Sequence, residues 1–297
     1  MKTQETMTAM TLKTLPKISI VTPSYNQGDY LEDTIQSVLD QSYQNLEYII
    51  IDGGSTDNSV NIIKKYEKYL AYWVSEKDQG QSHAINKGFS HATGDIFAWL
   101  NSDDCYMTEA LDCIVSTYIK NKNYDIFVGT GQIVDAHGNA LHNTKPPGEI
   151  TVESIYNWFN GSDFVQPSCF FTKEAWLRSG PLDENIHIAL DVDLWLRMAI
   201  SGCKYLSVDK VISSVKWHEK AKTTEFKNLM FVDASLVIAK HGGGNAVRNI
   251  LEEMAIKLTW YEKRYESICS NKLLKFVTSL TCNKSSMDES KPRWKSS

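Results

Sequence analysis

The stretch Asp95-Ile96-Phe97-Ala98-Trp99-Leu100-Asn101-Ser102-Asp103-Asp104 places an apolar run directly before polar and acidic residues. Such a run predicts a buried strand whose carboxyl end delivers two carboxylates into a crevice, where open α/β sheets bind their ligands. Mg²⁺ and Mn²⁺ are held by one or two carboxylates together with substrate phosphates. Asp103 and Asp104 are therefore either ligands of a metal-bound diphosphate or caps of a helix expected to start near Met107.

Short apolar strands alternate with helical segments around this stretch. Strands are expected at 18–21, 48–51, 72–74, 95–100, 126–130, 169–172, 204–208 and 211–216, and helices at 30–39, 58–69, 81–91, 109–119 and 191–200. Repeated β-α units predict an α/β fold with a doubly wound, mostly parallel sheet. Residues 136–139 predict a hairpin turn, and the chain beyond Thr223 is expected to be helical apart from Gly242-Gly243-Gly244.

The same pattern predicts the domain organisation. We expect an N-terminal extension at 1–16, one α/β domain at 17–240, a C-terminal helical appendage at 241–281 and a disordered tail at 282–297. Lys145-Pro146-Pro147-Gly148 marks the clearest internal break. It divides the domain into a half at 17–145, expected to bind a nucleotide, and a half at 146–240, expected to bind an acceptor.

Charge and composition exclude several classes of protein. The 297 residues carry a formal net charge of −5, which argues against nucleic acid as the main partner because phosphate backbones attract basic surfaces. The six cysteines show no metal-binding spacing, and neither a signal peptide nor a membrane-spanning apolar run is visible. A cytoplasmic protein with reduced thiols is the simplest expectation.

Three polar segments follow the ends of predicted strands, at 22–28, 52–57 and 101–104. In a parallel sheet these ends meet at one edge. There Asp52 can accept a hydrogen bond from a nucleobase N–H or a ribose hydroxyl, while Gly53 and Gly54 let the backbone approach a ligand. The alternative is an ordinary turn and helix cap, which we favour for Asp57.

Together the ordered motifs resemble the family 2 glycosyltransferases, which have the GT-A fold. The resemblance runs from about residue 17 to about residue 224. The motifs are Thr22-Pro23-Ser24-Tyr25-Asn26, Ile51-Asp52-Gly53-Gly54-Ser55-Thr56-Asp57, Glu76-Lys77-Asp78-Gln79-Gly80-Gln81-Ser82, Asn86-Lys87-Gly88 and Leu100-Asn101-Ser102-Asp103-Asp104.

The resemblance implies an inverting transfer of a sugar from a nucleotide-sugar donor, with Mn²⁺ or Mg²⁺ as cofactor. The residues that it assigns to the donor are Thr22, Pro23, Tyr25, Asp52, Asp78, Gly80, Asn101 and Ser102. Asn101 stands where many members of this family carry Asp, which leaves Asp103 and Asp104 as the carboxylates for the metal and leaves the metal affinity open.

The resemblance also implies roles for two later residues. Asp191, in Ala189-Leu190-Asp191-Val192-Asp193, falls on the position of the general base, although Asp is also a favoured helix cap. His218 falls where related enzymes carry a histidine that contacts metal or diphosphate; the alternative is an exposed loop residue. Asp193 is four residues from Arg197, which predicts a helix-surface ion pair.

The acceptor is expected to be a glycan or a lipid-linked glycan of a cell-surface polysaccharide. Trp158, Gln166 and Asp183 are the predicted acceptor-binding residues, although aromatic residues in this region also suit an ordinary core, as we expect for Trp176 and Trp195. Leu251, Met254, Leu258 and Tyr261 recur at helical spacing beside basic residues. They predict either peripheral contact with the inner face of the cell membrane or packing on the core.

Three competing functions remain to be weighed. A sugar nucleotidyltransferase would carry a basic glycine-rich loop after the first strand, but residues 22–28 contain neither Lys nor Arg. A dinucleotide oxidoreductase would need G-x-G-x-x-G after a strand, which is absent from the sequence. An inactive relative that binds a nucleotide or a carbohydrate stays open because of Asn101.

Overall fold

The computed structural model describes residues 15–144, 148–160, 164–218, 221–222 and 227–270. Most of the predicted extension at 1–16, most of the break at 145–148 and the whole predicted tail at 282–297 lie outside these ranges. The chain divides into two compact units, the first ending at Gly244 and the second beginning at Asn245. The expected active site belongs to the first unit.

The described strands form one mixed sheet in the order β3-β2-β1-β4-β8-β6-β9-β5, with β7 paired to β6. Strands β1 to β4 pair in parallel, β8 runs antiparallel to both β4 and β6, and β6 and β9 are parallel. Their bounds are β1 Ile18–Ser24, β2 Leu46–Asp52, β3 Tyr72–Ser75, β4 Ile96–Trp99, β5 Cys105–Tyr106, β6 Ile126–Val134, β7 Ala140–Asn143, β8 Cys169–Thr172 and β9 Tyr205–Lys216.

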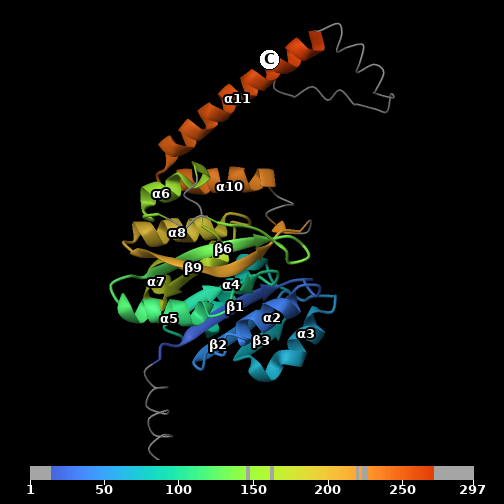
Figure 1. The fold of residues 1–297 in the computed structure, drawn as a ribbon, viewed down its shortest axis with the longest axis vertical. Helices are drawn as coiled ribbons and strands as arrows, with labels where there is room; N and C mark the ends of the chain where they lie inside the picture. The colour runs from blue at the N-terminus through green and yellow to red at the C-terminus, as the bar shows by residue number, and fades with distance from the viewer. Residues whose placement is uncertain (1–14, 145–147, 161–163, 219–220, 223–226, 271–297) are drawn as a thin grey trace, which may run out of the picture. The chain divides into compact units, whose positions relative to one another are not determined.

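Helices cover both faces of this sheet (Figure 1). The described helices of the chain are α2 Leu31–Leu39, α3 Ser59–Tyr66, α4 Gln81–His91, α5 Ala110–Lys120, α6 Val152–Tyr156, α7 Lys173–Ser179, α8 Leu190–Ile200, α10 Lys227–Lys240 and, in the second unit, α11 Gly244–Ser270, with short 3₁₀ turns η1 Glu67–Tyr69, η2 Trp158–Asn160 and η3 Gln166–Ser168. Helices α6 and α10 pack on α8.

Strand β4 shows how the sequence produces these layers. Its side chains alternate between the two faces of the sheet, and both sets are apolar because both faces are covered. Ile96, Ala98 and Leu100 join the buried cluster that includes residues of α2, α3 and α5. Phe97 and Trp99 point to the opposite face, where Trp99 stacks on Trp195 of α8 with ring centroids 5.5 Å apart. The prediction that Trp195 is a core residue is confirmed, since its exposed fraction is 0%.

The segment after β4 differs from the expectation. Residues 105–106 form the short strand β5, and α5 begins only at Ala110. Glu109 is the N-cap of α5, so Asp103 and Asp104 do not cap this helix. The capping interpretation of the acidic pair is therefore wrong.

The two strands expected at 204–208 and 211–216 are one continuous strand, β9. Between the pairs Val128–Ser207 and Thr130–Val211, β9 has three residues where β6 has one. A bulge at this point places the polar pair 209–210 without ending the strand. The predicted hairpin at 136–139 is confirmed as the connection between β6 and β7.

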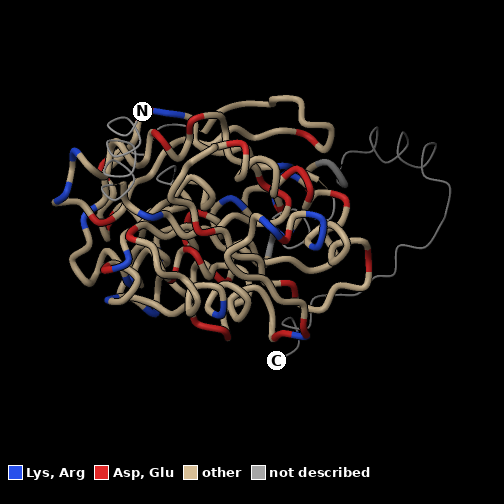
Figure 2. Tube along the Cα trace, turned by 90° about the horizontal axis from the view of Figure 1, so that it is seen from below, with Lys and Arg blue, Asp and Glu red and all other residues tan. Residues whose placement is uncertain are grey.

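The second unit contributes one described helix, α11, which spans 27 residues. It carries four basic and four acidic residues, so its net charge is zero. In the part of the chain that the structure describes, no helix is both long and apolar enough to cross a membrane. Lys and Arg are interspersed with Asp and Glu along the trace (Figure 2).

Candidate active site

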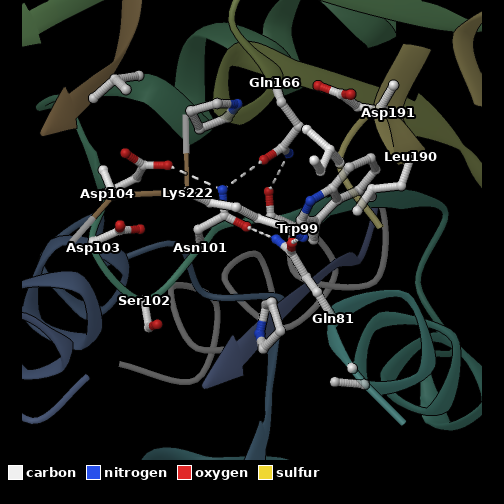
Figure 3. Close-up of a pocket in the computed structure, with 18 of the residues that line it drawn as sticks. Gln81, Trp99, Asn101, Ser102, Asp103, Asp104, Gln166, Leu190, Asp191 and Lys222 are labelled. Atoms are coloured by element: carbon white, nitrogen blue, oxygen red, sulfur yellow. Dashed lines mark hydrogen bonds between the residues drawn. The ribbon is translucent and has the colours of Figure 1, made fainter. Parts of the chain in front are cut away.

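A cavity of about 730 Å³ opens at the carboxyl ends of β1, β2 and β4. This volume is typical of pockets that bind small molecules. Both halves of the domain line the cavity, with Asp103 on one wall and Asp191 of α8 on another (Figure 3). Residues from all three polar segments, 22–28, 52–57 and 101–104, line this cavity, so the segments converge as predicted.

Asp103 lines the cavity and lies beside His218. The Oδ2 atom of Asp103 is 3.1 Å from the Nε2 atom of His218, and the carboxylate keeps 19% of its surface exposed. The His218 ring packs on Tyr30 with centroids 4.4 Å apart. Its Nδ1 atom is buried and has no hydrogen-bond partner among the described residues. His218 is therefore a buried side chain held against an acid, and the alternative of an exposed loop residue is wrong.

Asp104 is buried behind Asp103, with an exposed fraction of 4%. The backbone N–H of Lys216 and the side-chain amide of Asn101 donate to its two oxygens over 3.4 and 3.3 Å. Burial and the neighbouring Asp103 carboxylate raise the pKa of Asp104 well above its ordinary value. Asp103 is thus the more accessible of the two predicted metal carboxylates.

Asn101 and Ser102, two of the predicted donor residues, both line the cavity. The Asn101 amide is engaged on both sides, since its Oδ1 atom accepts from Gln81 Nε2 at 2.8 Å and its Nδ2 atom donates to Gln166 Oε1 at 3.3 Å. Gln166, a predicted acceptor residue, also lines the cavity but is 9% exposed and donates to the carbonyl oxygen of Trp99. Gln81 was not among the predicted site residues.

Pro23, Tyr25, Asp78 and Gly80 line the part of the cavity assigned to the donor. Tyr25 is 62% exposed. Asp78 accepts from the backbone N–H of Gly80 at 2.9 Å and lies against Gly53. A Cβ at Gly53 would come within 2.8 Å of Asp78 Oδ2, so the two loops can touch because residue 53 is glycine.

Thr22 and Asp52 are not among the residues that line the cavity, and their contact with the donor stays a prediction. Both are fully buried. Thr22 Oγ1 bonds the Tyr48 hydroxyl at 3.1 Å. The Asp52 carboxylate accepts from two backbone N–H groups and from the hydroxyls of Ser55 and Ser75. Asp52 therefore holds the loop at the end of β2, because its oxygens are taken up inside the protein.

Asp191 lies in the first turn of α8 and faces the cavity. The N-cap of this helix is Ala189, which makes no side-chain hydrogen bond, so the alternative that Asp191 is the cap is wrong. Its Oδ1 atom accepts from the N–H of Val192 at 2.9 Å. Burial raises the pKa of the Asp191 carboxyl, although this hydrogen bond and the charge of Lys222 oppose the shift. A carboxylate that gains basicity in this way is suited to accept a proton.

Asp193, two residues further on, is turned away from the cavity. It is 1% exposed and accepts from Arg197 Nε at 2.8 Å, from His241 Nε2 at 2.8 Å, and pairs with Lys240 at 3.6 Å. Burial opposes ionisation, but the hydrogen bond from His241 and the charge of Arg197 hold the pKa of Asp193 below its ordinary value. The predicted ion pair with Arg197 is present, but it is buried rather than on the helix surface.

Of the two remaining predicted acceptor residues, one lines the cavity and the other does not. Trp158, in η2, lines the cavity next to Phe164. Asp183 is not among the lining residues: it accepts from Asn185 and pairs with Lys240 at 3.1 Å. Asp183 therefore links the loop after α7 to helix α10, and its contact with the acceptor stays a prediction.

Two further polar residues line the cavity and are not among the predicted site residues, Lys222 and Ser24. Lys222 Nζ donates to Gln81 Oε1 at 3.0 Å and to the carbonyl of His187. Burial lowers the pKa of Lys222, while the nearby Asp191 works against that change. Ser24, the last residue of β1, has a buried hydroxyl without a partner in the described part of the chain. In the sequence, the position of Lys222 four residues after His218 was the feature that could have indicated its place in the cavity.

This sheet, with its cavity at the carboxyl ends of parallel strands, is the GT-A fold of glycosyltransferases. TarS of S. aureus superposes with a TM-score of 0.55 at 19% identity, over 76% of this chain and 42% of TarS. The mannosyltransferase PcManGT from Pyrobaculum calidifontis, in complex with GDP-Man and Mn²⁺, superposes with a TM-score of 0.55 at 16% identity, over 90% of this chain and 84% of that protein.

The sequence model of glycosyl transferase family 2 matches residues 19–179, and the chain belongs to this family. It is 30% identical over 258 residues to the putative teichuronic acid biosynthesis glycosyltransferase TuaG of Bacillus subtilis, covering 80% of this chain and 98% of TuaG. It is 28% identical over 208 residues to an uncharacterized glycosyltransferase of Rickettsia typhi, covering 67% of this chain and 64% of that relative. The aligned part thus spans slightly less than two thirds of the Rickettsia protein.

Proposed function

We propose that this protein is an inverting glycosyltransferase that moves a sugar from a nucleotide-sugar donor to a hydroxyl of a growing cell-surface polysaccharide. The observation that carries the proposal is that Asp103 and Asp191 line opposite walls of one cavity. One wall suits a nucleoside diphosphate and the other suits the acceptor hydroxyl. Inversion follows from a direct displacement in which donor and base lie on opposite sides of the sugar carbon.

The donor is proposed to lie along Pro23, Tyr25, Asp78 and Gly80. Tyr25 is exposed in the cavity and offers a flat aromatic surface to a base, while backbone groups near Gly80 approach the ligand. The solved neighbours support the class of donor, since TarS has been crystallised with UDP-GlcNAc and PcManGT with GDP-Man.

Asp103 and His218 are the residues that would hold a divalent cation. His218 Nε2 lies 3.1 Å from Asp103 Oδ2, and an imidazole nitrogen and a carboxylate oxygen are ordinary ligands of Mn²⁺. Within the described ranges, no group of three or more His, Cys, Asp or Glu side chains is arranged to bind a metal. This fits a cation whose coordination shell is completed by substrate phosphates. When bound, the metal would neutralise charge that develops on the departing nucleoside diphosphate.

Asp191 is proposed to be the general base. Its carboxylate faces the cavity, and burial in the wall of α8 makes it more basic than an exposed aspartate. As the acceptor oxygen attacks the sugar carbon, the carboxylate takes the hydroxyl proton. Lys222 lies near enough to influence the Asp191 carboxylate and offers its ammonium group to the diphosphate.

The acceptor is proposed to be a glycan or a lipid-linked glycan, with Trp158 providing a surface for a sugar ring. TuaG is named for teichuronic acid biosynthesis, and the chondroitin synthase of Pasteurella multocida is 27% identical over 217 residues, 72% of this chain and 22% of the synthase. Both names concern polysaccharides, which supports this class of acceptor.

We also propose that the protein acts in the cytoplasm, at the inner face of the cell membrane, through the apolar stripe of α11. Leu251, Met254, Leu258 and Tyr261 are each exposed by 46% or more. Because the basic and acidic residues of α11 are equal in number, binding would depend on the apolar side chains more than on anionic lipid.

A panel of donors tests the proposal. Thermal unfolding of the purified protein with UDP-, GDP- and dTDP-sugars, each with and without Mn²⁺, is expected to show one donor that stabilises the protein, because a ligand of the folded state raises its stability. The same donor is then offered with polysaccharide acceptors, and release of the nucleoside diphosphate is measured. Binding without transfer to any acceptor would favour an inactive relative.

A further inference from the structure

A chain of side-chain amides crosses the cavity (Figure 3). Lys222 Nζ donates to Gln81 Oε1 at 3.0 Å, and Gln81 Nε2 donates to Asn101 Oδ1 at 2.8 Å. Asn101 Nδ2 donates to Gln166 Oε1 at 3.3 Å, and Gln166 Nε2 donates to the Trp99 carbonyl at 2.8 Å. Each amide therefore accepts from one neighbour and donates to the next.

The two ends of the chain fix the direction of every bond. An ammonium group can only donate, so Lys222 requires the oxygen of Gln81. A backbone carbonyl can only accept, so Trp99 requires the nitrogen of Gln166. Asn101, in the middle, must present its oxygen to Gln81 and its nitrogen to Gln166. A carboxylate at position 101 has no hydrogen to donate and cannot replace it.

The chain connects parts of the protein that are distant in sequence. Gln81 is the first residue of α4, Asn101 follows β4, Gln166 opens η3 and Lys222 follows β9. The first two belong to the half at 17–145 and the last two to the half at 146–240. The amides thus join the donor wall of the cavity to its acceptor wall.

We infer that Asn101 is a positioning residue that holds the two walls together, and not a weakened metal ligand. Its only atom suited to a metal, Oδ1, is occupied by Gln81, and its Nδ2 atom is directed at Gln166 and at Asp104 Oδ2, 3.3 Å away. An aspartate at this position would place a carboxylate against Asp104 and against the oxygen of Gln166. This inference rests on the proposed function for the reaction that the two walls serve.

The decisive variant is Asn101→Asp, which introduces the residue common in the family. If Asn101 positions the walls, this variant lowers kcat by roughly 10-fold or more, because small displacements in an active site are costly. The concentration of Mn²⁺ needed for half-maximal nucleotide binding, measured by calorimetry, does not fall. A lower Mn²⁺ requirement, or a kcat equal to or above that of the wild type, would overturn the inference.

Variants of the neighbouring amides test whether the chain acts as a unit. Gln81→Glu keeps the acceptor for Lys222 but removes the donor to Asn101, and Gln166→Glu removes the donor to Trp99. Each is expected to lower kcat, and the double variant is expected to lose much less than the product of the two single losses, since members of one network are not independent. If the loss of kcat in the double variant equals the product of the two single losses, each amide acts separately, which contradicts the inference.

A matched control is available outside the cavity. Gln132 donates to Asn143 at 3.1 Å in an exposed amide pair between β6 and β7, so Gln132→Glu should leave kcat within about twofold. Thermal unfolding of the same variants gives a readout that needs no transfer. If the wild type neither binds nucleotides nor transfers sugar, the proposed function fails, and the coupling between Gln81 and Gln166 is then judged from the unfolding temperatures, where additive shifts would overturn it.

Discussion

The carboxylate of Asp103 and the imidazole of His218 lie 3.1 Å apart, although 115 residues separate them. Strand pairing explains the contact, because β5 pairs antiparallel with β9 and places Cys105 opposite Ser214. The residues just before β5 and just after β9 are therefore brought to the same end of the sheet. The proposed metal site depends on this pairing, since neither segment alone carries both side chains.

Replacement of Asp103 by alanine is expected to remove most of the effect of Mn²⁺ on nucleotide binding, because a carboxylate that holds a cation contributes chiefly through that cation. Calorimetric titration of the donor nucleotide, with and without Mn²⁺, measures the effect. Asp40→Ala, which changes an exposed aspartate after α2, is the matched control. Equal enhancement by Mn²⁺ in the wild type and in Asp103→Ala would contradict the assignment.

Asp193 is expected to contribute to stability and not to transfer. Asp193→Ala leaves Arg197 and His241 without their buried partner, and the loss of one member of a buried ion pair costs about 3 kcal/mol of the free energy of unfolding. Urea unfolding measures this cost. Donor affinity of the folded variant should stay within about twofold of the wild type, and a large loss of affinity at unchanged stability would show that Asp193 belongs to the site.

Much of the fold could be predicted because its signals are local. The alternating β-α pattern identified the strands up to β4, and the apolar run at 95–100 identified the centre of the sheet. The motif Asn86-Lys87-Gly88 resembles the family pattern, and the structure shows what two of its residues do. Asn86 pairs with the backbone of Leu182 in both directions, and a Cβ at Gly88 would come within 2.3 Å of Val21.

The sequence does not show which polar side chains are taken up by contacts with distant parts of the chain. Asp52 has the sequence position of a ligand contact, but Ser55 and Ser75 take up its oxygens inside the fold. Asp193 has the spacing of a surface pair, but α10 and His241 cover it. No local pattern indicates such coverage, so burial of these charges could not be predicted from spacing alone.

The apolar stripe of α11 is expected to bind vesicles. Leu258→Glu places a charge in the middle of the stripe and should reduce co-sedimentation with vesicles severalfold, whereas Thr259→Glu, on another face of the helix, adds the same charge outside it. Binding should depend little on the anionic lipid fraction, because α11 has no net charge. If the wild type stays in the supernatant at low salt, the membrane proposal is wrong and packing of the stripe within the protein is favoured.

The raised pKa of Asp191 predicts the pH dependence of the reaction. Transfer needs the ionised carboxylate, so kcat/KM should fall as the pH decreases through a pKa above the ordinary value of about 3.9 for aspartate. The stability of the folded state changes with pH in the opposite direction. A carboxyl whose pKa is raised by folding stabilises the folded state at low pH, and this contribution is lost as the pH rises through the folded pKa. At neutral pH, Asp191→Asn should therefore raise the unfolding temperature.

The central claim is that Asp191 takes the acceptor proton, and transfer by Asp191→Asn tests it most directly. Asparagine keeps the size of aspartate and cannot accept the proton, so α8 should survive while turnover falls by about a hundred- to ten-thousand-fold. Donor affinity, measured by calorimetry on the same preparation, should change little because Asp103 and the donor wall are untouched. Turnover within a few-fold of the wild type would contradict the account.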